Sequence, residues 1–380
     1  MELAFWFGPR MFHQSFTAGF PSGSGARIEV RGMPLTITEN TSIDYDIQGE
    51  GPPLILIGGL GFGRWGFFKQ VPALSRHFYT ITFDVRGQRD LKGGVSDLAG
   101  EVVALLEHLK VRRAHVLGTS LGGFVAQELA LKRPDLVERL VLVCTSYGGR
   151  GPESMSPWAL MDMIGLPSLS TERAIRRGLE TATSDTYRSE KPEEFERIVS
   201  WRLADSPSLS AYYEQARAGS RFDARTDVEH ITSPTLVIHG SEDRYVPVAN
   251  ARALAEEIAG ARVRVIEEAG HLVFIERFGE VNREVITFLK PRKPRKDRRR
   301  RRTPAQRLVE RAEKVGKGIF GGSRRHGKAQ RKGGGKREAR GAGESRKAEG
   351  DPAFRRFGRR LLDAPRAIRR WAGEAWARIS

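Results

Sequence analysis

The 380-residue sequence predicts an α/β protein with a mostly parallel central sheet flanked by helices. The first observation is a series of short, continuously apolar runs, which is typical of strands buried on both faces. The second is that helical patterns alternate with these runs. The runs lie at residues 53–59, 78–84, 114–120, 139–146, 234–240 and 262–270, and the helical patterns at 96–110, 120–132 and 247–259.

The N-terminal part precedes this alternation. Residues 1–26 end in a Gly, Ser and Pro-rich stretch, so we expect an N-terminal extension. They lack a basic segment followed by an apolar one, and we therefore expect no secretory signal. Residues 27–32 and 34–51 alternate in polarity, which predicts antiparallel strands ending in a turn.

Residues 147–230 interrupt the strand–helix alternation and contain no convincing strand. A structureless loop of this length is improbable in a compact domain. The interval instead predicts an inserted helical lid, with residues 27–146 and 231–290 forming the α/β core. Helical patterns within the lid lie at 157–165, 171–183, 192–205 and 209–219.

The C-terminal tail carries most of the formal net charge of +18. Residues 291–380 hold 31 Lys and Arg against 9 Asp and Glu, whereas residues 1–290 hold 33 against 37. We expect a basic, largely disordered linker at 291–350 and a basic amphipathic helix at 351–380. Three readings of the tail stay open: a solvated extension without a partner, attachment to an anionic membrane surface, and binding of nucleic acid.

Composition restricts the class of protein further. No apolar run reaches 18 residues, so no transmembrane helix is expected. The single cysteine, Cys144, cannot form an internal disulfide and lies in an apolar run typical of the core. These features favour a cytoplasmic protein, which would be peripheral at the inner membrane surface if the tail binds lipid. The oligomeric state is left open.

A candidate nucleophile lies where a predicted strand becomes a predicted helix. Residues 118–122 read Gly-Thr-Ser-Leu-Gly and match the pattern G-x-S-x-G. Such a turn exposes the serine hydroxyl above the sheet, and the next backbone N–H points at the same place, near a helix N-terminus. The pattern makes Ser120 the candidate nucleophile and Leu121 N–H a candidate oxyanion donor.

A serine nucleophile needs a base, and the base needs an orienting carboxylate. Asp243 and His271 follow the ends of two later predicted strands, in the chain order Ser, acid, His. Glu242 is the alternative acid, but Asp243 fits the G-x-x-D-x-x-x-P spacing better. Among the other histidines, His115 and His239 fall inside predicted strands and are interpreted as core residues.

A second oxyanion donor is expected from the glycine-rich turn after the first apolar run. By position, Leu60 N–H is the candidate. Loss of one such donor costs about 10²–10³ in turnover in comparable sites. The chemistry predicted from these residues is two-step acyl transfer, for which no metal or cofactor is expected.

Over about residues 30–290 the chain resembles the α/β-hydrolase family, especially its serine esterase, lipase and enol-lactonase branch. The resemblance rests on GGLG, DVRG, GTSLGG, GSEDRYVP and AGHLVF. It implies a Ser120, Asp243 and His271 triad, oxyanion donors at Leu60 and Leu121, and a helical lid at about 147–230. Two departures lie on rim loops: Gly58-Gly59 replaces the usual His-Gly, and the loop after DVRG is shortened.

The expected substrate is a small or medium apolar ester, thioester or lactone, because apolar side chains are frequent in the lid. Peptidase and cofactor-free haloperoxidase activities use the same triad and stay open. The candidate pocket residues are Gly59, Phe62, Trp158 and Met161.

Two alternatives to a hydrolase remain. Residues 61–66 match G-x-G-x-x-G, and Asp84 follows about 20 residues on, as in dinucleotide-binding proteins. The residues after this motif do not clearly open a helix, however. The second alternative is a hydrolase-like scaffold whose main role is binding through its basic tail.

Overall fold

The computed structural model describes residues 29–31, 35–38, 41–86, 91–92, 94–164 and 171–290. The predicted extension at 1–26, the predicted linker at 291–350 and the predicted amphipathic helix at 351–380 lie outside these residues. The three readings of the tail therefore stay predictions.

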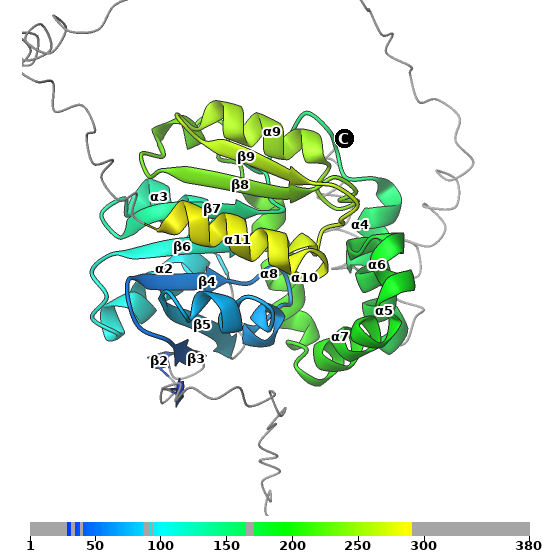
Figure 1. Cartoon of the computed structure of the whole chain (residues 1–380), viewed down its shortest axis with the longest axis horizontal. Coiled ribbons are helices and arrows are strands. Elements are labelled where there is room, and N and C mark those ends of the chain that lie inside the picture. The colour runs from blue at the N-terminus through cyan, green and yellow to red at the C-terminus, as the bar shows by residue number, and fades with distance from the viewer. Residues whose placement is uncertain are drawn as a thin grey trace, which may run out of the picture.

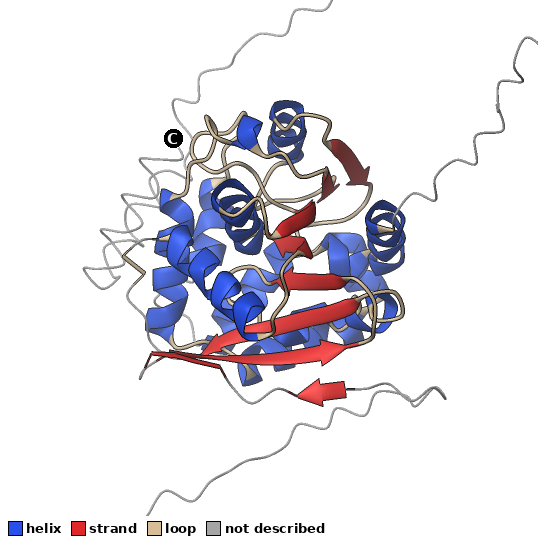
Figure 2. Cartoon of the chain, turned by 90° about the vertical axis from the view of Figure 1, so that its left-hand side faces the viewer, coloured by secondary structure: helices blue, strands red, loops and turns tan. Residues whose placement is uncertain are grey.

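The described strands form one nine-stranded sheet, in the order β1-β3-β5-β4-β6-β7-β8-β9, with β2 also paired to β3 (Figures 1 and 2). The six strands from β5 to β9 in this order run parallel, and β3 joins β5 antiparallel. The α/β fold predicted from the sequence is confirmed. The strands are β1 Glu29–Arg31, β2 Leu35–Thr38, β3 Thr41–Gln48, β4 Pro53–Ile57, β5 Tyr79–Arg86, β6 Ala114–Thr119, β7 Val137–Val143, β8 Thr235–Gly240 and β9 Arg262–Ile266.

Helices cover both faces of the sheet. Successive side chains of a strand point to opposite faces, so a strand of continuous apolar residues needs packing partners on both. In β4, Ile55 packs into one core cluster with α2, α3 and α9. Its neighbour Leu56 packs into a second cluster with α11, which crosses the front of the sheet in Figure 1. The helices of the body are η1 Arg64–Phe67, α1 Val71–Leu74, α2 Val95–His108, α3 Leu121–Lys132, α9 Val248–Glu257, α10 Val273–Glu276 and α11 Phe278–Leu289.

The last strand departs from the sequence prediction. The apolar run at 262–270 was expected to be buried on both faces, but Arg262, Val263 and Arg264 of β9 are exposed. The reason is its position: β9 ends the strand order and pairs with β8 alone. An edge strand needs less apolar surface than a central one.

The interval between β7 and β8 is helical, as predicted, and its helices α4 to α7 lie together at the right-hand end of the sheet in Figure 1. Their apolar side chains, including Phe195 and Ile198, join the second core cluster. One short helix, α6, was not predicted. The elements of this inserted lid are α4 Pro157–Ile164, α5 Thr171–Ala182, α6 Asp185–Glu190, α7 Pro192–Ala204, α8 Leu209–Arg221 and η2 Val228–His230.

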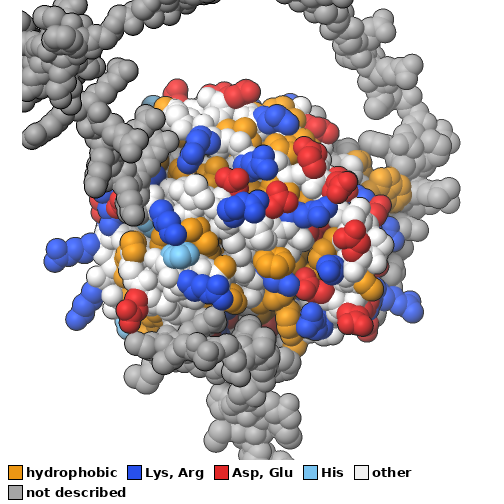
Figure 3. Space-filling model, in the orientation of Figure 1, with side chains coloured by type: hydrophobic (Ala, Val, Ile, Leu, Met, Phe, Trp, Pro, Cys, Tyr) orange, Lys and Arg blue, Asp and Glu red, His pale blue; other side chains and the backbone are white. Residues whose placement is uncertain are grey.

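The surface of the described body carries both signs of charge. On the face seen in Figure 3, basic and acidic side chains are interspersed rather than gathered into one patch. None of the helices in the described ranges is long and apolar enough to cross a membrane.

Candidate active site

Ser120 sits in a sharp turn between β6 and α3. Its backbone has φ 53° and ψ −118°, a conformation that non-glycine residues rarely adopt. A side chain on Gly118 would place its Cβ 2.2 Å from the Gly122 carbonyl oxygen, and one on Gly122 would meet the Ile57 carbonyl oxygen at 2.3 Å. Only glycine at positions 118 and 122 therefore allows these backbone segments to approach one another so closely.

Hydrogen bonds hold this turn in place. The Ser120 N–H donates to the Val143 carbonyl oxygen at 2.9 Å. The Thr145 hydroxyl donates to the Ser120 carbonyl oxygen at 2.9 Å. The backbone of Ser120 is thus tied to the end of β7 and to the residues that follow it.

Asp243 and His271 meet as the sequence predicted. Asp243 Oδ2 lies 2.8 Å from His271 Nδ1. Asp243 Oδ1 accepts hydrogen bonds from the N–H groups of Tyr245 at 2.9 Å and Val246 at 2.8 Å. The Asp243 side chain is fully buried, whereas the alternative acid, Glu242, is exposed. The N–H groups of the following residues thus hold Oδ1 of Asp243, and Oδ2 faces the His271 imidazole.

His239 is a second neighbour of Asp243, and this contact was not predicted. The residue is completely buried, as expected for a core histidine, but its Nε2 lies 3.1 Å from Asp243 Oδ2 and 2.7 Å from the Val246 carbonyl oxygen. Burial by itself raises the pKa of the Asp243 carboxyl. The charges and hydrogen bonds of His271 and His239 outweigh burial, so the net pKa lies well below its usual value. Asp243 is therefore kept ionised.

Ser120 and His271 line the same cavity, of about 730 Å³. We call it the His271 chamber; it lies between the sheet edge and the lid. Within the described chain, no hydrogen bond joins the Ser120 hydroxyl to His271. Because Nδ1 of His271 is bonded to Asp243, Nε2 is the ring nitrogen that remains for a proton from the serine.

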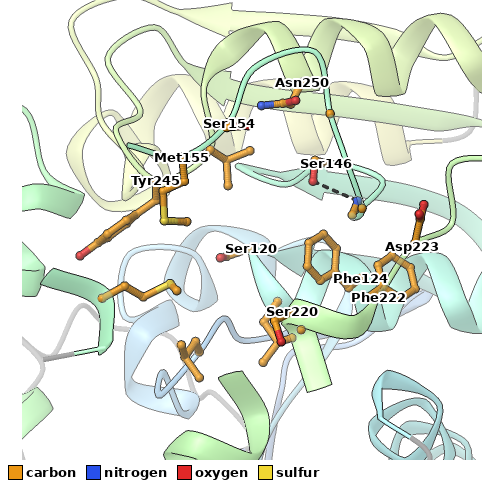
Figure 4. Close-up of a pocket in the computed structure, with 18 of the residues that line it drawn as sticks. Ser120, Phe124, Ser146, Ser154, Met155, Ser220, Phe222, Asp223, Tyr245 and Asn250 are labelled. Atoms are coloured by element: carbon orange, nitrogen blue, oxygen red, sulfur yellow. Dashed lines mark hydrogen bonds between the residues drawn. The ribbon is translucent and has the colours of Figure 1, made fainter. Parts of the chain in front are cut away.

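A second cavity, of about 540 Å³, is also lined by Ser120. We call it the Phe222 chamber. Figure 4 shows Ser120 between Tyr245 and Met155 on one side and Phe124 and Phe222 on the other. The two chambers share Leu60, Ser120, Met155, Met163, Tyr245 and Val246. The two chambers thus adjoin at Ser120.

The two candidate oxyanion donors lie beside the nucleophile. A Cβ on Gly59 would be 3.1 Å from Ser120 Cβ, so the turn that carries Leu60 touches Ser120. This turn is closed by a hydrogen bond of 3.0 Å from Phe62 N to the Gly59 carbonyl oxygen. Leu121 is the first residue of α3, directly after Ser120. The turn that carries Leu60 and the start of α3 thus both lie next to Ser120.

Two of the four predicted pocket residues line the His271 chamber, namely Gly59 and Phe62. Trp158 and Met161 line neither chamber, and this is a correction. Leu160 and Met163 of the same helix do line a chamber. At 100° per residue, positions 160 and 163 lie on the opposite face of α4 from 158 and 161. Trp158 is accordingly 39% exposed, and Met161 packs inside the lid.

The glycine motif at 61–66 does not lead into a long helix. It continues into the single turn η1 and the four-residue α1. Asp84, which would bind a ribose in a dinucleotide site, accepts hydrogen bonds of 2.6 Å from both the backbone N–H and Nε of Arg64. This geometry does not fit the dinucleotide alternative.

Potential metal ligands also meet here. One ligand atom each of Cys144, Asp243 and His271 lies within 4.8 Å of the others. Burial raises the pKa of the Cys144 thiol well above its usual value, so the thiol stays protonated. Both oxygens of Asp243 already have partners. Since a metal needs a thiolate and a free carboxylate oxygen, the three residues are poorly suited to hold one.

A family model described as the alpha/beta hydrolase fold matches residues 52–278. The chain is 31% identical over 259 residues to a putative non-heme bromoperoxidase, BpoC, of Mycobacterium tuberculosis, covering 65% of this chain and 97% of the relative. It is 25% identical over 257 residues to a putative carbamate hydrolase, RutD, of Agrobacterium fabrum, covering 65% and 98%.

Solved structures agree with these matches. The enol-lactonase from Burkholderia xenovorans LB400 is similar with a TM-score of 0.57 and 29% identity, over 66% of this chain and 96% of that one. A hydrolase from Pseudomonas aeruginosa is similar with a TM-score of 0.58 and 29% identity, over 68% and 98%. The match of the family model ends at residue 278, before the basic tail at 291–380.

Proposed function

This chain belongs to the alpha/beta hydrolase family, and on that premise we propose that it is a serine hydrolase of small or medium apolar esters, thioesters or lactones. The proposal is carried by one observation: Asp243 is bonded to His271 at 2.8 Å, and His271 shares a chamber with Ser120. This arrangement supplies an oriented base for a serine nucleophile.

The proposed reaction has two steps. The Ser120 hydroxyl attacks the substrate carbonyl while His271 Nε2 takes its proton, and Asp243 stabilises the imidazolium that forms. The N–H groups of Leu60 and Leu121 hold the negative oxygen of the tetrahedral intermediate. The leaving group departs with the proton from His271 and leaves an acyl group on Ser120. A water molecule then attacks this acyl group while His271 takes its proton. The carboxylic acid is released as the proton returns to Ser120.

The lining of the His271 chamber supports an apolar substrate. Apolar lid residues face it, among them Ile175, Leu179 and Met163. The similar enol-lactonase and the putative carbamate hydrolase are named for lactone and carbamate hydrolysis, which also proceed by attack at a carbonyl. We therefore propose carbonyl chemistry with a substrate whose body is apolar.

The test is hydrolysis of p-nitrophenyl esters of graded chain length, with lactones and thioesters beside them. We expect Ser120→Ala to lower kcat by about 10⁶, as loss of the nucleophile does in comparable triads. A fluorophosphonate probe should add to the wild-type protein at Ser120, as measured by mass spectrometry of peptides. The matched control is Ser200→Ala, which removes an exposed serine of the lid helix α7 and should keep full activity. Wild-type rates in Ser120→Ala would refute the proposal.

A further inference from the structure

Arg202, near the end of the lid helix α7, is a buried cation that lines the His271 chamber. Only 8% of the residue is exposed. Its guanidinium donates one hydrogen bond, to the Ser206 hydroxyl at 3.1 Å, and lies over the Tyr212 ring at 5.7 Å. Among the described residues, no carboxylate forms an ion pair with it. Four of its five N–H donors are thus left without a protein acceptor in the hydrogen bonds described.

The protein does not neutralise this charge in another way. Burial lowers the pKa of Arg202, and the electrostatic effects of Tyr212 and the Asp205 carboxylate only partly offset it. The Asp205 carboxylate lies instead at the Gly63 turn, where a Cβ on Gly63 would meet it at 2.9 Å. A buried charge without a partner destabilises the folded protein, because the charge has lost its hydration. A ligand that brings its own negative charge into the chamber would offset that cost.

The other charged side chain of the chamber is already engaged. Asp162 accepts hydrogen bonds from Arg177 and from the Thr181 hydroxyl. Apart from His271, the remaining lining residues are uncharged. A negatively charged ligand group would therefore find one attractive position in this chamber, at Arg202.

Arg202 lies close to the reacting centre. A Cβ on Gly61 would fall 2.1 Å from Arg202 Nη2, and Gly61 has the left-handed φ of 69°. The guanidinium thus packs against the same turn whose Gly59 touches Ser120. Two residues span at most about 7.6 Å between Cα atoms. Arg202, Ser120 and His271 also line the same chamber, so one ligand can contact all three.

We propose that Arg202 is a specificity-determining residue that binds a carboxylate on the acyl part of the substrate. The inference rests on the proposed function, because it uses the same chamber and nucleophile. The substrate class is a small ester, thioester or lactone with an apolar body and one carboxylate a few carbons from the carbonyl. Arginine suits this task because its planar fork donates two parallel hydrogen bonds to a carboxylate.

The test compares two esters that differ only at the far end of the acyl chain. Monoethyl adipate carries a carboxylate where ethyl hexanoate carries a methyl group. We expect the wild-type protein to favour the half-ester in kcat/KM, and Arg202→Met to reduce that preference by about 10- to 100-fold, mainly through KM. Arg202→Lys, which keeps the charge but loses the fork, should retain part of the preference. The control Arg197→Met removes an exposed arginine of the same helix and should leave the ratio unchanged.

A binding measurement keeps the test decisive if turnover is slow or a variant is unstable. Calorimetry should detect monoethyl adipate binding to Ser120→Ala protein, and the binding should be at least tenfold weaker in Ser120→Ala/Arg202→Met. Thermal melting of each variant checks that it is folded. Equal binding by the two folded proteins, or an equal ester preference in wild type and Arg202→Met, overturns the carboxylate site while the hydrolase proposal stands. Activity that survives Ser120→Ala would overturn the hydrolase proposal instead.

Discussion

The edge of the parallel sheet and the inserted lid contribute different things to this site. The groups proposed for the chemistry lie on short turns after β6, β8 and β9, where backbone hydrogen bonds fix them. The groups that surround the substrate come largely from lid helices, whose positions depend on side-chain packing. We therefore propose that turns of the α/β body carry the reacting groups and that the lid helices select the substrate.

This difference predicts two kinds of mutational effect. Substitutions at the sheet edge should lower turnover of every substrate alike. Substitutions in the lid should change which substrate is preferred and affect turnover less. The following experiments would sharpen this contrast or break it.

The largest of these effects is expected at Asp243. In Asp243→Asn the amide oxygen can still accept from Tyr245 and Val246, but the amide NH₂ then faces His271 Nδ1. That forces the wrong tautomer on the imidazole, and we expect kcat to fall by about 10⁴ for short and long esters alike. The measurement is kcat across the p-nitrophenyl series. A loss that depends strongly on chain length would break the contrast, since the sheet edge would then also select substrate.

A smaller effect is expected at Met163, a lid residue that lines both chambers. Met163→Ala removes apolar surface from the pocket but leaves its backbone carbonyl to accept from the Tyr212 hydroxyl. We expect kcat/KM for the preferred acyl chain to fall about tenfold and the optimum to move to longer chains. Trp158→Ala, on the opposite face of the same helix, is the control and should leave the chain-length profile as it is. A uniform loss of kcat in Met163→Ala would contradict the division of roles.

The smallest effect concerns the body away from the site. Burial lowers the pKa of His115, at the start of β6, to about 4, against about 6.5 in an unfolded chain. The unfolded state therefore binds a proton more readily, and the free energy of unfolding should decrease as pH falls from about 6.5 towards 4. Urea unfolding should show a lower midpoint concentration of urea at pH 5 than at pH 7, and His115→Leu should reduce the difference between the two midpoints by about 0.6 M.

Two features make this pH experiment specific. The Asp243 pKa is depressed, so its contribution is lost only below about pH 4, outside the chosen interval. The exposed His230 serves as the control, because His230→Leu should keep the wild-type difference between the two pH values. If His230→Leu and His115→Leu behave alike, burial is not the cause.

The difference between the turns of the body and the lid also explains which parts of the site the sequence could predict. The sequence predicted the positions of Ser120, Asp243 and His271, because each lies in a turn that a few adjacent residues identify. The apolar spacing of Val281, Val285 and Phe288 also carried the signal for α11, although that helix was not assigned in advance. Strand β9 was placed correctly, but its exposure depends on the order of strands, which the sequence does not state.

The lid was harder to predict in detail, for a physical reason. The apolar composition of α4 predicts a packed helix but not which face turns to the cavity, and the choice of Trp158 and Met161 was wrong for that reason. Arg202 gives no sequence signal at all, because an arginine near a helix C-terminus is usually exposed. The contact of His239 with Asp243 likewise exists only once the turn after β8 has formed.

The unusual backbone at Ser120 has a consequence beyond catalysis. A conformation of this kind costs about 1–3 kcal/mol in any residue that bears a Cβ, and the protein carries that cost whether substrate is present or not. Glycine would relieve it and would also delete the hydroxyl. We therefore expect Ser120→Gly to stabilise the fold while it removes the proposed nucleophile, so stability and the proposed activity favour different residues at this position.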